Sequence, residues 1–388
     1  EPALMSYDYS DDGDLIANRN ADDHGEHYAY QNHIITCRTL ASGYRFHFEW
    51  DRLDNHGRCL HQWGDKGYYD YRFHWDPENK VTQVTDGRGI KQTCHYNAFG
   101  HVTEETDGQG HTSRYDYNSA GQRIAATDPE GHTLHYHYDD HSRFLGATDA
   151  LGHRTCLGYF QGRVTQFINA VGHRWQRRFN DKGLLTHVTD PHGQSTHYHY
   201  TQHGLINSIT EANGHQHRYE WNQQAELIKE TDALSNQRHY QYDSWGRVIS
   251  LIVQTKGQSY LLAAKTPTRY DYSAAGHMRS ITHPDGTQSH FEYSPTGHLS
   301  RYSDPQGRVT QYFYDDGLSQ PSRRIDPDGN SLCYHYDEER NLIGLINENG
   351  DCYQFDYDAN ERLIREIGFD GRTQRYAYNG AGHLIEHT

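Results

Sequence analysis

One interval dominates this chain of 388 residues: an aromatic pair returns every 21 residues. Tyr115-Asp116-Tyr117-Asn118 comes back as Tyr136-His137-Tyr138-Asp139, with Asp128-Pro129-Glu130-Gly131 between the two copies. If the second aromatic of each pair is taken as a marker, there are 18 markers, and 12 of the 17 intervals between them equal 21 residues. Units of this length bury their apolar faces only against neighbouring copies, so the repeat decides the architecture of the whole chain.

The residues around each marker alternate as they do in a β-strand. Two positions before the marker the residue is Tyr or Phe in 15 of 18 copies, and the residue between them is usually polar, as at Asp116 and Glu220. Residues two apart on a strand share a face, so the two aromatics lie together and the opposite face is wet. The markers are Tyr9, Tyr30, Trp50, Trp75, Tyr96, Tyr117, Tyr138, Tyr159, Phe179, Tyr200, Trp221, Tyr242, Tyr272, Tyr293, Tyr314, Tyr336, Tyr357 and Tyr378.

Two kinds of turn divide each unit. The A turn follows the aromatic pair, as in Asn118-Ser119-Ala120-Gly121, and the B turn follows the next short strand, as in Asp128-Pro129-Glu130-Gly131. Asx at the start bonds its own backbone two residues on, and Gly at the end tolerates positive φ, so the A turn predicts a tight hairpin with a bulge. Asp, Pro and Gly at the first, second and fourth positions of the B turn favour a type I turn.

The sequence therefore predicts an all-β fold of tandem β-hairpin repeats. A lone hairpin is unstable in water, so the units are expected to pair edge to edge into one continuous antiparallel ribbon of about 36 strands. Because strands twist and one face is aromatic, the ribbon should spiral and form part of a hollow shell, with the tyrosine rows of adjacent units lying side by side. A weaker alternative is a propeller with two units in each four-stranded blade.

We expect residues 1–388 to be a single array of about 18 repeats, with a longer insertion at 248–266. That insertion suits a plug, a subunit contact or simply a longer hairpin. The residues predicted to carry the repeat are Tyr115, Tyr117, Gly121, Asp128, Pro129, Gly131, Tyr136, Tyr138, Asp190, Gly193, Tyr198, Tyr200, Tyr240, Tyr242 and Gly246.

Composition narrows the classes of partner. The 32 Tyr residues argue against disorder even though the mean hydropathy is -1.03. The net charge is -16 and no run of Lys or Arg occurs, so nucleic acid is an unexpected partner. No stretch is apolar enough to span a membrane, and the six scattered cysteines signal neither a zinc site nor a disulfide framework.

Catalytic and cofactor chemistry is not expected. Many of the 31 histidines follow a turn glycine, as His101 follows Gly100, and we interpret these as solvated turn residues rather than metal ligands. The aspartates recur in the turn positions of nearly every unit, whereas a catalytic pair would break the pattern. We therefore predict a protein that is not an enzyme and that has no metal site and no cofactor.

The unit of aromatic-x-Tyr-Asx-x-x-Gly-Arg followed by Thr-Asp-Pro-x-Gly resembles the YD (Rhs) repeat. Clear instances are Tyr240-Gln241-Tyr242-Asp243-Ser244-Trp245-Gly246-Arg247 and the run from Tyr115 to Gly131. The segment at 81–89 is similar to the early core of bacterial Rhs proteins of the type VI secretion kind. The likeness spans essentially the whole chain. It also extends to the C component of Tc toxins, to teneurins and to wall-associated surface proteins.

This resemblance implies a shell that encloses a C-terminal toxin domain for delivery to target cells in interbacterial competition. The implied partners are that toxin domain, the remaining Rhs core, N-terminal secretion-machinery domains and an immunity protein acting on the toxin. The implied location is bacterial, with synthesis in the cytoplasm and export as part of a larger toxin. The family's self-cleaving aspartate motif has no match here, because Asp326-Pro327-Asp328-Gly329 is an ordinary B turn, and no toxin domain is expected. The alternative function is carbohydrate binding by a cell-surface adhesion module.

Overall fold

The computed structural model describes residues 4–255 and 266–388, and strands dominate it. The described residues form 36 strands and one short 3-10 helix, η1 (Asp65–Gly67), and they contain no α-helix. Within each of two sheets, neighbouring strands of the chain pair antiparallel. The predicted all-β class and the tandem hairpins are therefore confirmed, and the propeller alternative is wrong because no blades separate from the ribbon.

Fourteen strands form the first sheet and 22 the second. The first comprises β1 (Met5–Tyr9), β2 (Leu15–Asn20), β3 (His27–Gln31), β4 (Ile34–Thr39), β5 (Arg45–Trp50), β6 (Cys59–Gly64), β7 (Tyr71–Asp76), β8 (Val81–Thr85), β9 (Lys91–Tyr96), β10 (Val102–Thr106), β11 (Thr112–Tyr117), β12 (Arg123–Thr127), β13 (Thr133–Tyr138) and β14 (Phe144–Thr148). The second comprises β15 (Cys156–Phe160), β16 (Arg163–Ile168), β17 (Arg174–Phe179), β18 (Leu185–Thr189), β19 (Ser195–Tyr200), β20 (Ile206–Thr210), β21 (Gln216–Trp221), β22 (Leu227–Thr231), β23 (Gln237–Tyr242), β24 (Val248–Gln254), β25 (Thr268–Tyr272), β26 (Met278–Thr282), β27 (Gln288–Tyr293), β28 (Leu299–Ser303), β29 (Val309–Phe313), β30 (Arg323–Ile325), β31 (Ser331–Tyr336), β32 (Leu342–Ile346), β33 (Cys352–Tyr357), β34 (Leu363–Ile367), β35 (Thr373–Tyr378) and β36 (Leu384–His387).

The predicted bulge lies at the marker. In the hairpin of β11 and β12 the register shifts between Asp116 and Tyr117, so that Tyr117 faces Arg123. Gly121 closes the A turn with a φ of +78°, a conformation that is costly for a residue with a side chain. A bulge bends its strand and increases the local twist, and most hairpins of the array carry one at the marker. The repeat therefore builds curvature into each unit.

The two sheets follow one another without a break in the ribbon. Between β14 and β15, Thr148 and Arg154 form an isolated bridge, and the Thr155 amide donates to the Ala147 carbonyl over 2.9 Å. Here a Cβ at Gly146 would stand 2.0 Å from the Thr155 carbonyl oxygen. Glycine is therefore required where β15 approaches β14 most closely.

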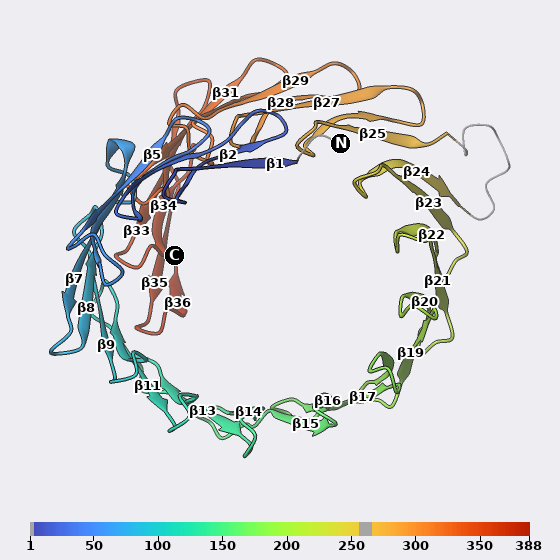
Figure 1. Cartoon of the computed structure of the whole chain (residues 1–388), viewed down its shortest axis with the longest axis horizontal. Helices are drawn as coiled ribbons and strands as arrows, with labels where there is room; N and C mark the ends of the chain where they lie inside the picture. Colours follow the sequence, from blue (N-terminus) through green and yellow to red (C-terminus); the bar gives the residue numbers. More distant parts are fainter. Residues whose placement is uncertain (1–3, 256–265) are drawn as a thin grey trace.

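The ribbon bends into an open spiral. Figure 1 shows it curving around an open centre until the last third of the chain, in orange and red, lies beside the first quarter, in blue. Hydrogen bonds join residues 252 apart, as between Gly108 and Asn360. Gly108 lies between β10 and β11 and Asn360 between β33 and β34, so one winding takes about 23 strands, each turning the ribbon by about 16°. We call β1–β24 the first winding and β25–β36 the second winding.

Two units exceed the 21-residue repeat by four residues or more. Between Trp50 and Trp75 the extra residues form the turn after β5 and the η1 turn, where Lys66 has a φ of +63°. Between Tyr242 and Tyr272, β24 is extended to seven residues. The rest of the predicted insertion, 256–265, lies outside the described residues, and a plug or contact there stays a prediction. No helix of the described chain has the length and apolar character that crossing a membrane requires.

Few side chains are fully buried, as expected for a wall one sheet thick. Among the described residues other than glycine, the buried ones are Ala17, Tyr44, Ala125, Ser250, Ser273, Ser289, Leu318, Glu339 and Arg340. Five of these, Tyr44, Ser273, Leu318, Glu339 and Arg340, lie where the two windings meet. The closest equivalent of a core is therefore the line of contact between windings.

Candidate functional site at the contact between windings

The marker side chain joins each repeat to the one before it. The Tyr117 hydroxyl donates to the carbonyl of Val102, 15 residues earlier, over 2.8 Å. Tyr138, Tyr200 and Tyr242 make the same bond over 3.0, 2.6 and 2.8 Å. Tryptophan markers make it through the indole N–H, as Trp221 does to Ile206. The bond therefore explains why most markers carry a ring with a donor at its far end.

The face of the marker ring is covered by a residue from the A turn of the preceding repeat. His101 stacks on Tyr117 with ring centroids 4.8 Å apart, and the guanidinium of Arg143 lies 5.0 Å from the Tyr159 ring. His277 stacks on Tyr293 in the same way. The interpretation of these histidines as solvated is therefore wrong. The expectation of tyrosine rows in direct contact also needs correction, because the ring contacts of these markers go to His and Arg.

The first aromatic of the pair binds differently. The Tyr115 hydroxyl lies 3.3 Å from Glu105, and the Tyr240 hydroxyl 3.2 Å from Glu230, in each case ten residues earlier. Tyr136 contacts the ring of Phe144 at 6.3 Å, and Tyr198 lies opposite Ile209 in the sheet. The predicted tyrosines therefore lie at the joints between strands of the wall.

The predicted turn residues hold the turns. The Asp128 carboxylate accepts the amide of His132 over 2.8 Å, and the Asp190 carboxylate accepts that of Gln194 over 2.8 Å. Pro129 occupies the second position of its B turn. The closing glycines Gly131, Gly193 and Gly246 have φ values of +88°, +79° and +74°. These carboxylates are engaged by backbone amides of their own turns.

The two windings meet turn to turn along a line that we call the seam: B turns of the first winding face A turns of the second. In its regular part the Gly108 amide donates to Asn360 Oδ1 over 3.1 Å, and Asn360 Nδ2 donates to Asp107 over 2.5 Å. Farther along, the Gly380 amide donates to Glu130 over 2.8 Å. The separations of 252, 253 and 250 residues correspond to the same 23 strands, or eleven and a half repeats, at each contact.

Asp107 shows how the seam acts on its carboxylates. Burial alone would raise the pKa of Asp107, but hydrogen bonds from the His111 amide and from Asn360 outweigh it and lower the pKa. At the start of the seam, Asp22 accepts hydrogen bonds from Ser273 over 2.5 Å and from the Ala275 amide over 3.2 Å. These bonds likewise outweigh burial and lower the pKa of Asp22. Both carboxylates are therefore held in their charged form.

The middle of the seam contains a buried charged cluster. The Tyr71 hydroxyl donates to Glu339, which also accepts the Gly87 amide over 3.3 Å. Burial raises the pKa of the Glu339 carboxyl, and these two hydrogen bonds only partly offset it. Next to it, Arg340 pairs with Asp316, and its guanidinium lies 4.4 Å from the Tyr336 ring. The side chains of Arg340 and Asp316 are only 3% and 11% exposed, so this ion pair is shielded from water.

The seam changes register in this region. Asp22 bonds Ser273, 251 residues later, whereas the Ser42 hydroxyl donates to the Gly317 carbonyl, 275 residues later. The offset thus grows by about one repeat, and the A turn at 294–297 makes no hydrogen bond to the first winding among the described residues. The regular offset returns at Gly87, which bonds Glu339. We call residues 24–71 and 294–340 the shifted part of the seam.

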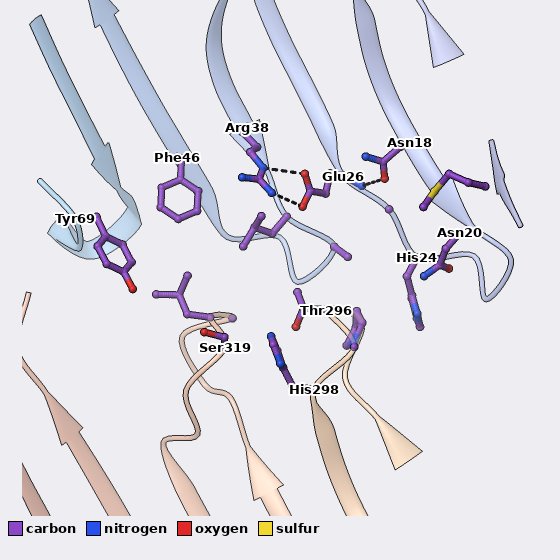
Figure 2. A pocket seen from close by; sticks show the side chains of 18 of the residues that line it. Asn18, Asn20, His24, Glu26, Arg38, Phe46, Tyr69, Thr296, His298 and Ser319 are labelled. Carbon is purple, nitrogen blue, oxygen red and sulfur yellow. Dashed lines mark hydrogen bonds and ion pairs between the residues drawn. The ribbon is translucent and has the colours of Figure 1, made fainter. Parts of the chain in front are cut away.

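A cavity of about 700 Å³ opens where the turn at 294–297 has no partner. Figure 2 shows Phe46, Tyr69 and the ion pair of Arg38 with Glu26 on the first winding, facing Thr296, His298 and Ser319 on the second. Arg38 holds Glu26 through two hydrogen bonds of 2.8 Å. Sequence reasoning missed this cavity and the seam, because partners 250 residues apart carry no local signal. The intervals of 25 residues from Trp50 to Trp75 and 22 residues from Tyr314 to Tyr336 are the traces of the shift in the repeat.

The described residues form no group of three or more His, Cys, Asp or Glu side chains arranged to hold a metal ion. The cysteines Cys37, Cys59, Cys94, Cys156, Cys333 and Cys352 are free thiols. Burial raises the pKa of the Cys59 and Cys94 thiols, which disfavours the reactive thiolate. The arrangement therefore offers structure and surface for binding rather than a nucleophile.

Two family models match the sequence. The RHS repeat model matches residues 96–133, 117–155 and 179–216, and the teneurin YD-shell model matches residues 216–388. A curated relative, double-stranded DNA deaminase toxin A of Burkholderia cenocepacia (strain H111), is 30% identical over 116 residues. That match covers 30% of this chain and 8% of the relative.

Solved structures share the fold. The crystal structure of TcdB2-TccC3 has a TM-score of 0.64 at 13% identity and covers 98% of this chain and 27% of its own. The structure of the Photorhabdus luminescens Tc holotoxin pore has a TM-score of 0.61 at 14% identity and covers 98% of this chain and 24% of its own. The present chain thus spans about a quarter of each. With this spiral of hairpins and the two family matches, the chain belongs to the Rhs family of YD-repeat proteins and has the fold of a YD-repeat shell.

Proposed function

We propose that this chain is a non-catalytic wall segment of an Rhs toxin, which encloses a C-terminal toxic effector domain and sequesters it until delivery. The observation that carries the proposal is the seam. A ribbon that passes over itself and bonds turn to turn, as Gly108 does to Asn360, can separate an inside from an outside. A ribbon without such bonds would leave gaps between its windings.

The relatives support a role in a toxin. The matched stretch of the Burkholderia relative belongs to a protein named as a toxin, and the structural neighbours are parts of Tc toxins. We take residues 1–388 as one array of about 18 repeats without a toxin or self-cleaving domain of its own. Delivery by a type VI secretion system to competing bacteria is the form of export that we propose.

The proposed partners follow from this role. They are the enclosed effector, the remaining Rhs core, N-terminal domains that engage the secretion machinery, and an immunity protein that acts on the effector. The protein would be made in the bacterial cytoplasm and exported as part of a larger toxin. A structural role without catalysis is supported by the aspartates, since carboxylates such as Asp128 and Asp190 are engaged by their own turns.

Imaging and proteolysis together test the shell. Electron microscopy of the full-length protein should show a hollow particle, and the enclosed C-terminal domain should resist protease. Opening the seam with Arg340→Ala should expose that domain, whereas Arg301→Ala should not, because Arg301 pairs with Glu292 at an exposed site. A solid or extended particle, or equal digestion of the effector in all three proteins, would refute the enclosure.

A further inference from the structure

The strands from β12 to β20 differ from the rest of the ribbon in charge. None of these nine strands contains Asp or Glu on either face, although the whole chain has a net charge of -16. The carboxylates of this stretch, such as Asp128 and Asp190, lie in turns at the rims of the ribbon. Figure 1 shows β15 to β20, in green, where the ring is one winding deep. Because the seam joins windings through their turns, the faces of these strands are left open.

One hairpin of this stretch brings basic side chains together on the face opposite the marker rings, which we call the polar face. Arg178 on β17 lies directly opposite His187 on β18, which lies opposite His197 on β19. The rings of His187 and His197 are in contact, with centroids 4.4 Å apart. Alternate residues of a strand share a face, so Arg174 and His199 lie on this face too. We call Arg174, Arg178, His187, His197 and His199 the basic patch.

The same position in three other hairpins holds a pair of opposite charges. These pairs are Glu220 with Lys229, Glu292 with Arg301, and Asp356 with Arg365. Like charges placed directly opposite one another destabilise a sheet, so Arg178 with His187 is an unfavourable arrangement for the wall alone. Such local departures from stability are expected at functional positions.

The basic patch has no counter-charge within the part of the chain that the structure describes. Apart from a 2.9 Å bond between His187 and the neighbouring Thr186 hydroxyl, its side chains make no hydrogen bond or ion pair. Burial, and then the positive charges of His197, Arg178 and His199, lower the pKa of His187. A bound anion would relieve this repulsion.

The flanking strands supply no free carboxylate to the polar face. On one side β16 presents Gln166 and Ile168, and on the other β20 presents Ser208 and Thr210. Beyond β20, β21 presents Arg218 and Glu220, and the Glu220 carboxylate is engaged by Lys229 over 2.9 Å. The charge of the basic patch is therefore left for a partner.

We infer that the basic patch binds an acidic segment of a partner protein, an extended peptide with several Asp or Glu residues. Every second side chain of such a peptide lies on one side, about 7 Å apart, which matches residues two apart on a strand such as His197 and His199. The guanidinium of Arg178 suits a carboxylate, with which it forms paired hydrogen bonds. The backbone amides here are used in the sheet, so no nest of N–H groups exists for a compact phosphate. Nucleic acid fits less well, since the polar face of β17 to β20 has no Tyr, Phe or Trp on which a base could stack.

The binding should strengthen as the pH falls. Three of the five patch residues are histidines, which gain a proton near pH 6.5, whereas glutamate stays charged down to about pH 4.3. Between pH 7.5 and pH 5.5 the patch therefore rises from two positive charges toward five, while the peptide keeps its negative charges. The partner would be held more tightly in acid.

Fluorescence anisotropy with rhodamine-labelled hexaglutamate tests this inference on the full 388-residue chain at low salt. We expect a dissociation constant below about 1 mM at pH 5.5, and binding at least about fivefold weaker at pH 7.5. Arg178→Gln should weaken binding about threefold, as expected for one partly exposed ion pair, and Arg178→Glu about tenfold or more. His197→Gln should reduce the dependence on pH.

The matched control is Arg301→Gln, which removes the same charge from the same face but takes it from an ion pair with Glu292. Both Arg variants change the net charge equally, so a difference between them reports the patch itself. His74→Gln, on the polar face of β7, is the control for His197→Gln. Arg178→Gln should not lower the unfolding temperature, because Arg178 has no carboxylate partner among the described residues, and this separates lost binding from lost folding.

The inference is overturned if hexaglutamate does not bind at pH 5.5, or if Arg178→Gln and Arg301→Gln weaken binding equally. It is also overturned if Arg178→Gln lowers the unfolding temperature, which would make Arg178 a structural residue. Displacement of the peptide by an equal concentration of phosphate, or tighter binding of labelled hexathymidylate that Arg178→Gln abolishes, would point to another class of ligand and contradict it. None of these measurements depends on whether the chain encloses an effector.

Discussion

The regular and the shifted parts of the seam are built from the same repeat and differ in what they bury. Where the separation is 252 residues, turn meets turn and small polar groups such as Asn360 complete the contact. Where it reaches 275 residues, the contact needs a buried ion pair, Arg340 with Asp316, and leaves a cavity beside the turn at 294–297. The strict repeat therefore closes the wall with turn-to-turn hydrogen bonds, and the local departure from it places a buried ion pair at the contact.

The largest expected effect is in the shifted part. Arg340→Ala leaves the Asp316 carboxylate buried without its cation, which should destabilise the chain by about 3–5 kcal/mol. Arg301→Ala removes an ion pair whose members are 42% and 61% exposed and should cost less than about 1 kcal/mol. Urea unfolding measures both. Equal costs for the two variants would mean that the cluster is not buried in solution.

The next effect compares one bonded A turn with the unbonded one. Asn360→Ala removes the acceptor of the Gly108 amide and should cost about 1–3 kcal/mol. Thr296→Ala, in the turn that faces the cavity, should change stability by about 0.5 kcal/mol or less. Hydrogen exchange at Gly108 should quicken only in the first variant. Faster exchange there in Thr296→Ala would remove the distinction between the two parts.

A smaller effect concerns the joints between repeats. Tyr117→Phe deletes the hydroxyl that donates to Val102 and should cost about 1 kcal/mol in thermal unfolding. Tyr9→Phe is the comparison, because the Tyr9 ring is 61% exposed and belongs to the first repeat. We expect no measurable change for Tyr9→Phe. If Tyr9→Phe lost as much stability as Tyr117→Phe, the hydrogen bond to the Val102 carbonyl would not be the cause of the loss.

The smallest effect distinguishes the two parts by pH. The pKa of Asp107 is lowered from 3.8 in the folded chain. Asp107 therefore stabilises the fold above pH 3.8, and this stabilisation is lost as the pH falls through the folded pKa. The pKa of Glu339 is raised from 4.5 in the folded chain. Protonated Glu339 therefore stabilises the fold below pH 4.5, and this stabilisation is lost as the pH rises through the folded pKa. Acidification should therefore loosen the regular part and tighten the shifted part.

Amide exchange is measured between pH 6 and pH 3 at Gly108 and at Tyr69, whose amide donates to the Glu338 carbonyl across the shifted part, and is corrected for the intrinsic effect of pH. Asp107→Asn and Glu339→Gln are the matched controls, since each replaces a titrating carboxyl by an amide and should flatten its own profile. Parallel profiles at the two amides in the wild type would argue against opposite pKa shifts at Asp107 and Glu339.

Much of the wall could be predicted from sequence because its determinants are local. The alternation around Tyr115 and Tyr117 specifies a strand, and Asn118 with Gly121 specifies the turn. The winding could not be predicted, since it depends on the angle between successive strands, summed over about 23 strands. Gly108 and Asn360 become hydrogen-bond partners only because the angles between all the intervening strands add up to one full winding. The roles of His101 and Arg143 were missed for the same reason, because their ring partners lie in the next repeat.

The central claim is that about eleven and a half repeats, or 23 strands, complete one winding and bring B turns onto A turns. In a variant whose six native cysteines are replaced by serine, Gln109→Cys and Arg362→Cys place thiols on side chains that touch across the seam, 253 residues apart. Cross-linking of the dilute protein with a short bismaleimide should join them within one chain, whereas Gln109→Cys with His192→Cys should stay unlinked. Absence of the intramolecular link in the first pair, or equal linking of both pairs, would contradict the winding.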